Sequence, residues 1–355
     1  MSYFLAFAGF AALIILHEFG HFVAAKAVGM RVERFALFFP PLFVKKQIGE
    51  TEYGIGLIPL GGFVKITGMN PEEELPPDVA PRAYYHQPVW KRIVVIAAGP
   101  FVNLAIAFLI LFGLAFGAQE LTSRVAETTP GSPAERVLRS SDRIISVDGV
   151  TGDQTDLARQ ISKHRCSGEP RPGCLARTPA VLRVERDGRI LTIRVRPRYD
   201  PDQGRTLIGF SFATRPLDPS PAEAAETSLD LMWAVTKGTV EAIVRIFDPE
   251  KREQISGVVG SYEITRQAIE FDTRRALAVL AVISLSLAIV NLFPFLPLDG
   301  GHIFWSLVEK VRGRPVPYRI MEQSGVFGFI LVIFLFAIGL SNDIGRLTGG
   351  GFDTR

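Results

Sequence analysis

Two histidines and a glutamate near the start of the chain have the types and the spacing needed for metal chemistry. The sequence His17-Glu18-Phe-Gly-His21 separates the histidines by four residues and places the glutamate beside the first. On an α-helix, residues four apart share one face, so both imidazoles could bind one metal ion while Glu18 acts as a base. This pattern is typical of zinc hydrolases.

The motif lies in an apolar segment, residues 3–28, in which no charged residue precedes Glu18. A carboxylate at the centre of a bilayer costs about 2.5–3.5 kcal/mol on insertion scales. Three polar residues in such a segment therefore need a compensating partner, and a metal ion would serve. The alternative is a buried core helix whose polar groups pair with one another.

The composition indicates a protein that is partly embedded in a membrane and partly in water. Of its 355 residues, 48% are hydrophobic and 21% are charged, and the mean hydropathy is +0.24. The 39 basic and 36 acidic residues give a net charge of only +3, and no basic cluster with interleaved aromatic residues occurs. The sequence therefore does not indicate binding of a nucleic acid.

Four apolar segments could cross a bilayer, namely residues 3–28, 93–118, 276–296 and 326–340. Each is long enough, or nearly so, to span about 30 Å of hydrocarbon at about 1.5 Å per residue. We expect the first to be retained, because it lacks the basic region and the small-residue cleavage site of a signal peptide. The expected fold is a multi-pass α-helical membrane protein with four transmembrane helices.

Basic residues in the connections set the expected orientation. Residues 26–92 contain nine Lys and Arg residues and residues 310–319 contain four, whereas none precedes the first apolar segment. The positive-inside rule then places these two connections in the cytoplasm and both termini outside. The long central region, residues 119–275, must then lie outside as well.

Residues 118–215 have the pattern of a compact α+β module inserted between transmembrane helices. We expect a short helix after Pro130 and a β-hairpin around residues 187–188. The run from residue 131 to residue 149 resembles a PDZ domain of the bacterial type. A spacer that only restricts access to the membrane site is the alternative for this module.

The two cysteines of the chain, Cys166 and Cys174, both lie in this module. In an oxidising compartment, such a closely spaced pair favours a disulfide over a metal site, because two sulfurs alone leave zinc under-coordinated.

After the module, residues 216–275 carry apolar side chains at helical spacing, for example Leu229, Met232 and Trp233. This pattern predicts an amphipathic helix that lies on the membrane surface or packs over the transmembrane helices.

Asp299 is the candidate third metal ligand. Two histidines leave zinc in need of a third protein ligand and a water, and Asp299 is the only intramembrane carboxylate far from Glu18. Pro294, Pro297 and two glycines would unwind the helix here, and exposed backbone at membrane depth is tolerated only in protein or beside a wet cavity. Asn291 could place its amide near a substrate carbonyl, or it could make a helix-capping or interhelical hydrogen bond.

Taken together, the motif at residues 17–21, the outer PDZ-like module and the sequence Asn-x-x-Pro-x-x-Pro-Leu-Asp-Gly at residues 291–300 resemble the site-2 protease family. Within it, the chain is similar to the bacterial regulator-of-sigma-E protease branch, over nearly its whole length. The resemblance implies a zinc-dependent intramembrane endopeptidase with one Zn²⁺ ion per chain. It implies His17, His21 and Asp299 as ligands, Glu18 as general base and Asn291 near the substrate.

The resemblance also implies that residues 48–68 form a membrane re-entrant β-hairpin. Its free edge could pair with an unwound substrate strand. The residues expected to bind substrate there are Ile55, Leu57, Gly61 and Gly62. The substrates implied are single-span membrane proteins, either anti-sigma factors or remnant signal peptides, cut first by another protease in regulated intramembrane proteolysis.

The expected domain plan has four parts. Residues 1–117 hold two transmembrane helices and the β-loop, residues 118–215 the PDZ-like domain, residues 216–275 the amphipathic region, and residues 276–355 two more transmembrane helices with the Leu-Asp-Gly motif. The resemblance implies the bacterial cytoplasmic (inner) membrane, with both termini and the PDZ-like domain outside. It does not indicate an oligomeric state.

Two other classes of protein fit part of the pattern. A zinc or proton transporter would also bury His and Asp residues, but it should show inverted repeats, and the sequence shows no internal repeat. A non-enzymatic scaffold would explain the outer module but not the three candidate ligands. The remaining histidines, His86, His164 and His302, have no partners at ligand spacing, and His302 is expected to be structural.

Overall fold

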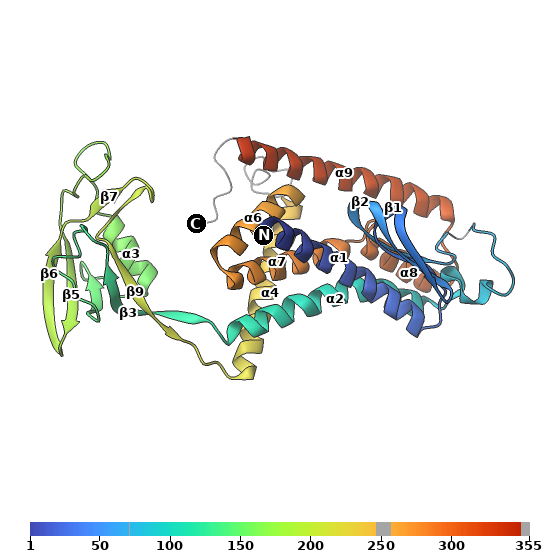
Figure 1. Cartoon of the computed structure of the whole chain (residues 1–355), viewed down its shortest axis with the longest axis horizontal. Coiled ribbons are helices and arrows are strands. Elements are labelled where there is room, and N and C mark those ends of the chain that lie inside the picture. Colours follow the sequence, from blue (N-terminus) through green and yellow to red (C-terminus); the bar gives the residue numbers. More distant parts are fainter. Residues whose placement is uncertain (71, 246–256, 349–355) are drawn as a thin grey trace. The chain divides into compact units, whose positions relative to one another are not determined.

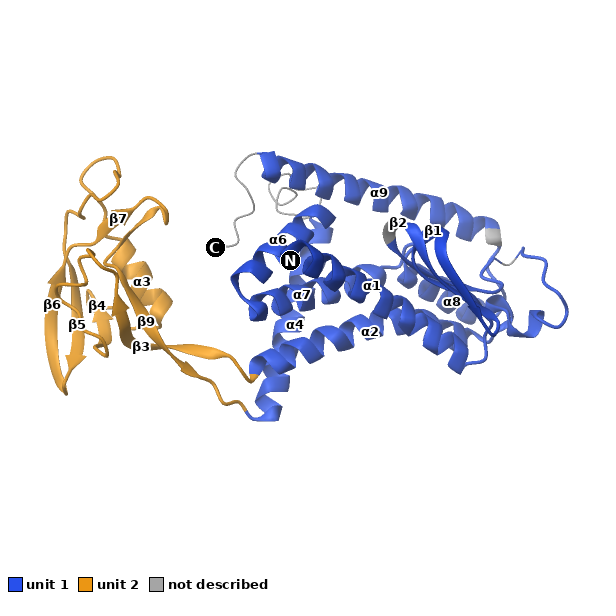
Figure 2. Ribbon diagram, viewed as in Figure 1, with its two compact units in different colours: residues 1–115, 220–355 blue, residues 116–219 orange. Residues whose placement is uncertain are grey.

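The computed structural model describes residues 1–70, 72–245 and 257–348. The chain divides into two compact units (Figure 2), one made of Met1–Ala115 with Ser220–Arg355 and the other of Phe116–Pro219. The second unit is thus a single insertion in the chain of the first.

Four helices in the described part of the first unit are long and apolar enough to cross a membrane. They are α1 (Ser2–Ala27), α2 (Val89–Ala115), α7 (Thr273–Asn291) and α9 (Tyr318–Thr348), shown in Figure 1. Large apolar side chains on them are exposed, as lipid contact requires, for example Phe101 at 68% and Phe327 at 65%. The predicted number of membrane-spanning helices is confirmed, although α9 extends well beyond the apolar segment expected at residues 326–340.

Further helices of the first unit pack between and beside these four. They are α4 (Pro221–Val244), α6 (Val258–Phe271), α8 (Asp299–Arg312) and two 3-10 turns, Ala80–Arg82 and Tyr84–His86. Met232 and Val235 of α4 pack against a cluster that contains Ala107 of α2 and Leu285 of α7. Of the two arrangements expected for this amphipathic region, the structure therefore has the one in which α4 covers the transmembrane helices.

A sheet formed by β1 (Val32–Ile48) and β2 (Thr51–Ile66) packs against α1. Both strands turn back on themselves, so the sheet has four segments, in the order 42–48, 51–58, 32–39 and 62–66. The two outer pairs are antiparallel, whereas the inner pair, residues 34–39 with residues 52–58, is parallel. The expected hairpin at residues 48–68 is therefore too short, because residues 32–39 also pair, on one side with residues 52–58 and on the other with residues 62–66. Residues 62–66 form one free edge of the sheet and are called the edge segment below.

The turn between β1 and β2 is tied to the end of α1. Glu50 in this turn accepts hydrogen bonds from both terminal nitrogens of Arg82, at 2.7 and 2.8 Å, and from Lys26 Nζ at 2.5 Å. The bonds from Arg82 and then from Lys26 lower the pKa of Glu50 to about 2, because they favour its charged form. The sheet is thus held beside the helix that carries the histidine motif.

The second unit is built on a five-stranded sheet. Its strand order is β6 (Arg189–Val195), β5 (Ala180–Arg186), β4 (Arg143–Val147), β3 (Gln119–Thr128) and β9 (Phe210–Pro216). The unit also contains the helix α3 (Gln154–Ser162) and a hairpin of β7 (Arg198–Asp200) and β8 (Arg205–Leu207). The predicted hairpin around residues 187–188 is confirmed, and positive φ angles at Asp187 and Gly188 match a type I′ turn. The short helix expected after Pro130 is wrong, since residues 133–137 form only turns.

Asp142 anchors the core of the second unit. Its side chain is 1% exposed and pairs with Arg186 at 2.6 Å, while one of its oxygens also accepts the backbone N–H of Arg139 at 2.8 Å. Burial by itself would raise the pKa of Asp142, but these bonds outweigh it and hold the pKa below its usual value. The pair therefore stabilises this unit at neutral pH, and the stabilisation is lost when the pH falls through the lowered pKa of the folded state.

Candidate metal centre

α1 and α8 bring the three predicted ligands together. His17 and His21 lie one turn apart on α1, and Asp299 is the first residue of α8. Asp299 Oδ2 is 3.2 Å from His17 Nε2 and 3.3 Å from His21 Nε2, and the two Nε2 atoms are 3.3 Å apart. Residues separated by most of the chain thus form one buried cluster, with both histidines less than 8% exposed.

The donor set of this cluster fits a zinc ion. Catalytic zinc is usually held by three protein ligands of the imidazole and carboxylate kind, with a fourth position left open for water. Asp299 Oδ2 is buried and makes no hydrogen bond in the described structure, although two imidazole nitrogens lie within 3.3 Å of it. A cation among these three atoms would satisfy all of them at once.

His21 is oriented for this role by the backbone of α2. Its Nδ1 lies 2.9 Å from the carbonyl oxygen of Val95, which can only accept, so Nδ1 carries the proton. The lone pair of Nε2 then points into the cluster. This arrangement is the usual support of a metal-binding histidine.

Glycines allow α1 and α2 to approach closely at the motif. A Cβ atom on Gly20 would lie 2.6 Å from the carbonyl oxygen of Ala98, and one on Gly99 would lie 2.3 Å from His21 Nε2. Small residues at such positions are how membrane helices pack backbone to backbone. Gly99 therefore leaves the space in which the His21 ring lies.

We expect Gly99→Ala to weaken zinc binding at least tenfold, because the added methyl group must displace the His21 ring from its bond with Val95. Zinc content after purification and competition with a chelator would measure the loss. Gly113→Ala is the matched control on the same helix, since its Cβ would meet nothing within 4 Å. Equal zinc affinity of both variants would show that Gly99 does not set the ring position.

Glu18 faces the sheet from the same helix turn. A Cβ atom on Gly62, the first residue of the edge segment, would lie 2.9 Å from Glu18 Cγ. The Glu18 carboxylate is also close enough to His17, His21 and Asp299 to interact with them electrostatically. Glu18 thus lies beside both the candidate ligands and a free strand edge.

A folded-back loop delivers Asp299 to the cluster. α7 ends at Asn291, and residues 292–298 form turns before α8 begins, so the predicted helix break is present. A Cβ atom on Gly300 would lie 2.2 Å from the carbonyl oxygen of Leu292, which shows how tightly the loop packs on α8. On the other side, a Cβ atom on Gly328 of α9 would lie 1.7 Å from the carbonyl oxygen of Leu296.

An ion pair that the sequence did not reveal ties α8 to α2. Arg92 is 2% exposed, and its two terminal nitrogens contact the two carboxylate oxygens of Glu309 at 3.0 and 2.5 Å. Position alone placed Arg92 among the basic residues of a cytoplasmic connection. The sequence signal for this ion pair is an arginine at the start of an apolar helix together with a glutamate on the helix that follows the proline-rich break.

The residues expected to bind substrate are only partly accessible to a new strand. Ile55 already pairs with Leu37 on one side and Val44 on the other, so a free edge at Ile55 does not exist. Leu57 lies in the same inner segment, whereas Gly62 begins the edge segment and Gly61 directly precedes it. Of the predicted positions, only the two glycines lie at an edge.

The predicted substrate contact Asn291 and the three histidines not expected to be ligands lie outside the metal cluster. Asn291 is the last residue of α7 and is half-buried. His302 lies in the first turn of α8, His86 contacts the carbonyl oxygen of Ala80 at 2.7 Å, and His164 contacts Asp148 at 2.7 Å. The last two thus have structural partners.

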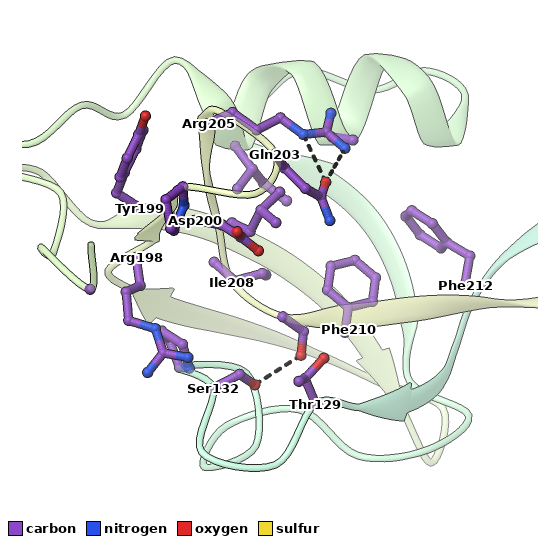
Figure 3. Close-up of a pocket in the computed structure, with 17 residues that line it drawn as sticks. Thr129, Ser132, Arg198, Tyr199, Asp200, Gln203, Arg205, Ile208, Phe210 and Phe212 are labelled. Carbon is purple, nitrogen blue, oxygen red and sulfur yellow. Dashed lines mark hydrogen bonds between the residues drawn. The ribbon is translucent and has the colours of Figure 1, made fainter. Parts of the chain in front are cut away.

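The second unit has a cavity of about 700 Å³ beside the edge strand β9 (Figure 3). Its lining includes Ile161 of α3, Phe210 and Phe212 of β9, and Arg198 and Arg205 of the β7–β8 hairpin. A disulfide joins Cys166 to Cys174 in this unit, with Cα atoms 6.2 Å apart. The backbone N–H of Tyr199 donates to the carbonyl oxygen of Cys174 at 2.8 Å, so the bridged loop supports the hairpin that borders the cavity.

Comparison with known proteins agrees with this geometry. Residues 5–335 match peptidase family M50. The zinc metalloprotease Rip1 of Mycobacterium tuberculosis is 32% identical over 392 residues, which cover 93% of this chain and 94% of the relative. A protein of Clostridium perfringens provisionally named a zinc metalloprotease is 30% identical over 342 residues, covering 96% of this chain and 97% of the relative.

The family match extends over nearly all of the chain and includes both the histidine motif and Asp299. It confirms the predicted enzyme class and the predicted zinc ion, and four long apolar helices make the protein a membrane protein. The chain therefore belongs to peptidase family M50, the site-2 protease family, and is a zinc metalloprotease.

Proposed function

We propose that this protein is an intramembrane endopeptidase that cuts the transmembrane segments of single-span membrane proteins. One observation carries the proposal. The cluster of His17, His21 and Asp299 lies on the membrane-spanning helix α1 and directly after the membrane-spanning helix α7, not in the second unit. A hydrolytic centre at that depth suits a peptide bond within a membrane segment.

His17, His21 and Asp299 would hold one zinc ion per chain, and Glu18 would act as the general base. Bound zinc supplies Lewis-acid chemistry, which makes water a nucleophile near neutral pH and polarises a carbonyl group. The Glu18 carboxylate takes a proton of the attacking water as the new C–O bond forms, and then passes it to the amine nitrogen as the peptide C–N bond breaks. Asn291, just before the loop that carries Asp299, would contact the substrate backbone.

The edge segment would bind the substrate as an added strand. A transmembrane helix hides its carbonyl groups in internal hydrogen bonds, so it must unwind before cleavage. An unwound segment paired with residues 62–66 would run past Glu18, because Gly62 packs against that side chain. This replaces pairing at Ile55, whose backbone is already paired on both sides.

The sheet itself would enter the membrane as a re-entrant element. Large apolar side chains on it are exposed, including Phe43 at 60%, Ile48 at 55% and Leu57 at 60%. Such side chains are costly in water and suit a lipid environment. In that position the edge segment reaches a substrate at membrane depth.

The second unit would lie outside the bacterial cytoplasmic membrane, together with both termini, and act as a PDZ-like domain. β9 is an edge strand beside the cavity, an arrangement suited to an added peptide strand. An extracytoplasmic location also suits the disulfide between Cys166 and Cys174. The substrates would be anti-sigma factors or remnant signal peptides that another protease has already shortened, as in regulated intramembrane proteolysis.

Purified protein in detergent should cleave a model single-span peptide that contains helix-breaking residues, and removal of zinc should stop cleavage. The His17→Ala protein should have lost both zinc and cleavage. Cleavage within the membrane segment, located by mass spectrometry, separates a protease from a zinc or proton transporter. If the intact protein cleaves only water-soluble peptides, the assignment of a membrane substrate is wrong.

A further inference from the structure

Asn103 is a buried amide without a partner in the membrane-spanning helix α2. Its side chain is fully buried, and neither Oδ1 nor Nδ2 makes a hydrogen bond in the described structure. Burying such a group is costly, because its hydrogen bonds with water are lost and not replaced. An unsatisfied amide of this kind in a native protein calls for an explanation in function.

His17 has the matching need. A metal-binding histidine almost always donates its second ring N–H to an acceptor, and His21 does so toward the carbonyl oxygen of Val95 at 2.9 Å. The Nδ1 atom of His17 is buried and has no such partner in the described structure. On α1 and α2, the buried side-chain atoms without a hydrogen bond belong to His17, Arg92 and Asn103.

The packing of α1 on α2 places Asn103 at the level of His17. At the C-terminal end of α1, Lys91 Nζ of α2 donates to the carbonyl oxygen of Val28. Further along α2, the carbonyl oxygen of Val95 contacts His21, which precedes Val28 in the chain, so the two helices run antiparallel. Gly99 lies against the His21 ring. One turn further along each helix are His17 and Asn103, and a helical side chain leans back toward the N-terminus of its helix, here toward Gly99.

The third helix, α7, closes this region. Ser284 Oγ donates to the backbone carbonyl oxygen of Asn103 at 3.0 Å, and Ser284 is also fully buried. The backbone of Asn103 is therefore satisfied from α7, while its side-chain amide remains available on α2. Arg92 is a poor alternative partner for His17, since it is a donor and its terminal nitrogens pair with Glu309.

We propose that Asn103 is the positioning residue of His17. Its Oδ1 accepts the Nδ1–H of His17, directly or through one bridging water, and so directs His17 Nε2 toward Asp299. The proposal rests on the proposed function, in which His17 is a zinc ligand. The two histidines are then supported in different ways, His21 by a backbone carbonyl and His17 by a side-chain amide on the same helix.

The test compares zinc affinity and stability of the full-length chain in detergent. Asn103→Leu removes the acceptor at similar volume, Asn103→Asp keeps an acceptor, and Ser284→Ala is the matched control, a buried polar residue whose hydroxyl donates to the Asn103 backbone and not to its side chain. Competition with a chelator should show zinc affinity about 10- to 100-fold lower in Asn103→Leu and within a few-fold of wild type in the other two. Without zinc, Asn103→Leu should melt close to wild type, because it removes the Nδ2 group that lacks a partner but also takes the acceptor from His17 Nδ1–H.

The His17→Ala variant tests the proposed zinc ligands separately from the proposed role of Asn103. If His17→Ala keeps normal zinc affinity, the proposed ligand set fails. If His17→Ala loses zinc but Asn103→Leu binds it as wild type does, only the role of Asn103 is overturned. A lower melting temperature of zinc-free Asn103→Leu, with zinc affinity equally reduced in Asn103→Asp, would show a packing role and overturn the proposal. Should Asn103→Leu not fold, Asn103→Ala takes its place with the same expected loss, and wild-type affinity in it counts against the proposal.

Discussion

Replacing Glu18 with glutamine is expected to abolish peptide cleavage and to leave zinc bound. Glutamine has nearly the shape of glutamate, so the packing of Glu18 against Gly62 should persist. It cannot take up the proton of an attacking water, and a general base contributes about 10²- to 10⁴-fold to such reactions. Cleavage of a transmembrane peptide should therefore fall by about two to four orders of magnitude, while metal analysis of the same sample finds unchanged zinc.

The zinc content of the Glu18→Gln protein distinguishes a general base from a metal ligand. The cluster able to hold a metal in the described structure consists of His17, His21 and Asp299, without Glu18. Loss of zinc from the Glu18→Gln protein would make Glu18 a ligand instead of a base, and cleavage at the wild-type rate would remove it from the mechanism. Glu33→Gln is a suitable control, because Glu33 lies on the sheet that Glu18 faces, pairs with Lys65 at 2.6 Å and is not part of the metal cluster.

The three candidate ligands were predictable because polar residues at membrane depth are rare and costly. His17 and His21 stand out in an apolar segment, and Asp299 follows two prolines that interrupt another. Residue type therefore carried the information, and no knowledge of packing was needed. The same reasoning located the four spanning helices, since length and hydropathy alone define them.

What escaped prediction depends on backbone atoms and on close packing. The carbonyl oxygen of Val95 supports His21, and any residue type could have supplied it. Gly99 is required only because the His21 ring lies against it, which the sequence of α2 does not reveal. Ile55 lies in a segment whose alternating pattern correctly predicts a β-strand. Its free edge is lost because residues 32–39, which are distant in the sequence, pair with this segment.

Asp299→Asn is expected to lower both zinc affinity and cleavage. Asparagine keeps the shape but loses the negative charge, and Asp299 is the one anionic member of the candidate ligand set. The loss of zinc affinity should exceed the tenfold to hundredfold that removing a hydrogen-bond partner of a ligand causes. Chelator competition would measure the affinity, and excess zinc should restore part of the cleavage, which it cannot do for Glu18→Gln.

Asp299 has a second role that must be separated from the first. It is the acidic residue in the first turn of α8, where a negative charge favours the helix by about 0.3–1 kcal/mol. Glu309→Gln is the matched control, because it weakens the pairing of the same helix with Arg92 at a distance from the ligands. If Glu309→Gln lowers the melting temperature but keeps zinc, while Asp299→Asn loses zinc at a similar melting temperature, Asp299 acts on the metal. If both variants lose zinc in proportion to their loss of stability, Asp299 acts only by holding α8 in place.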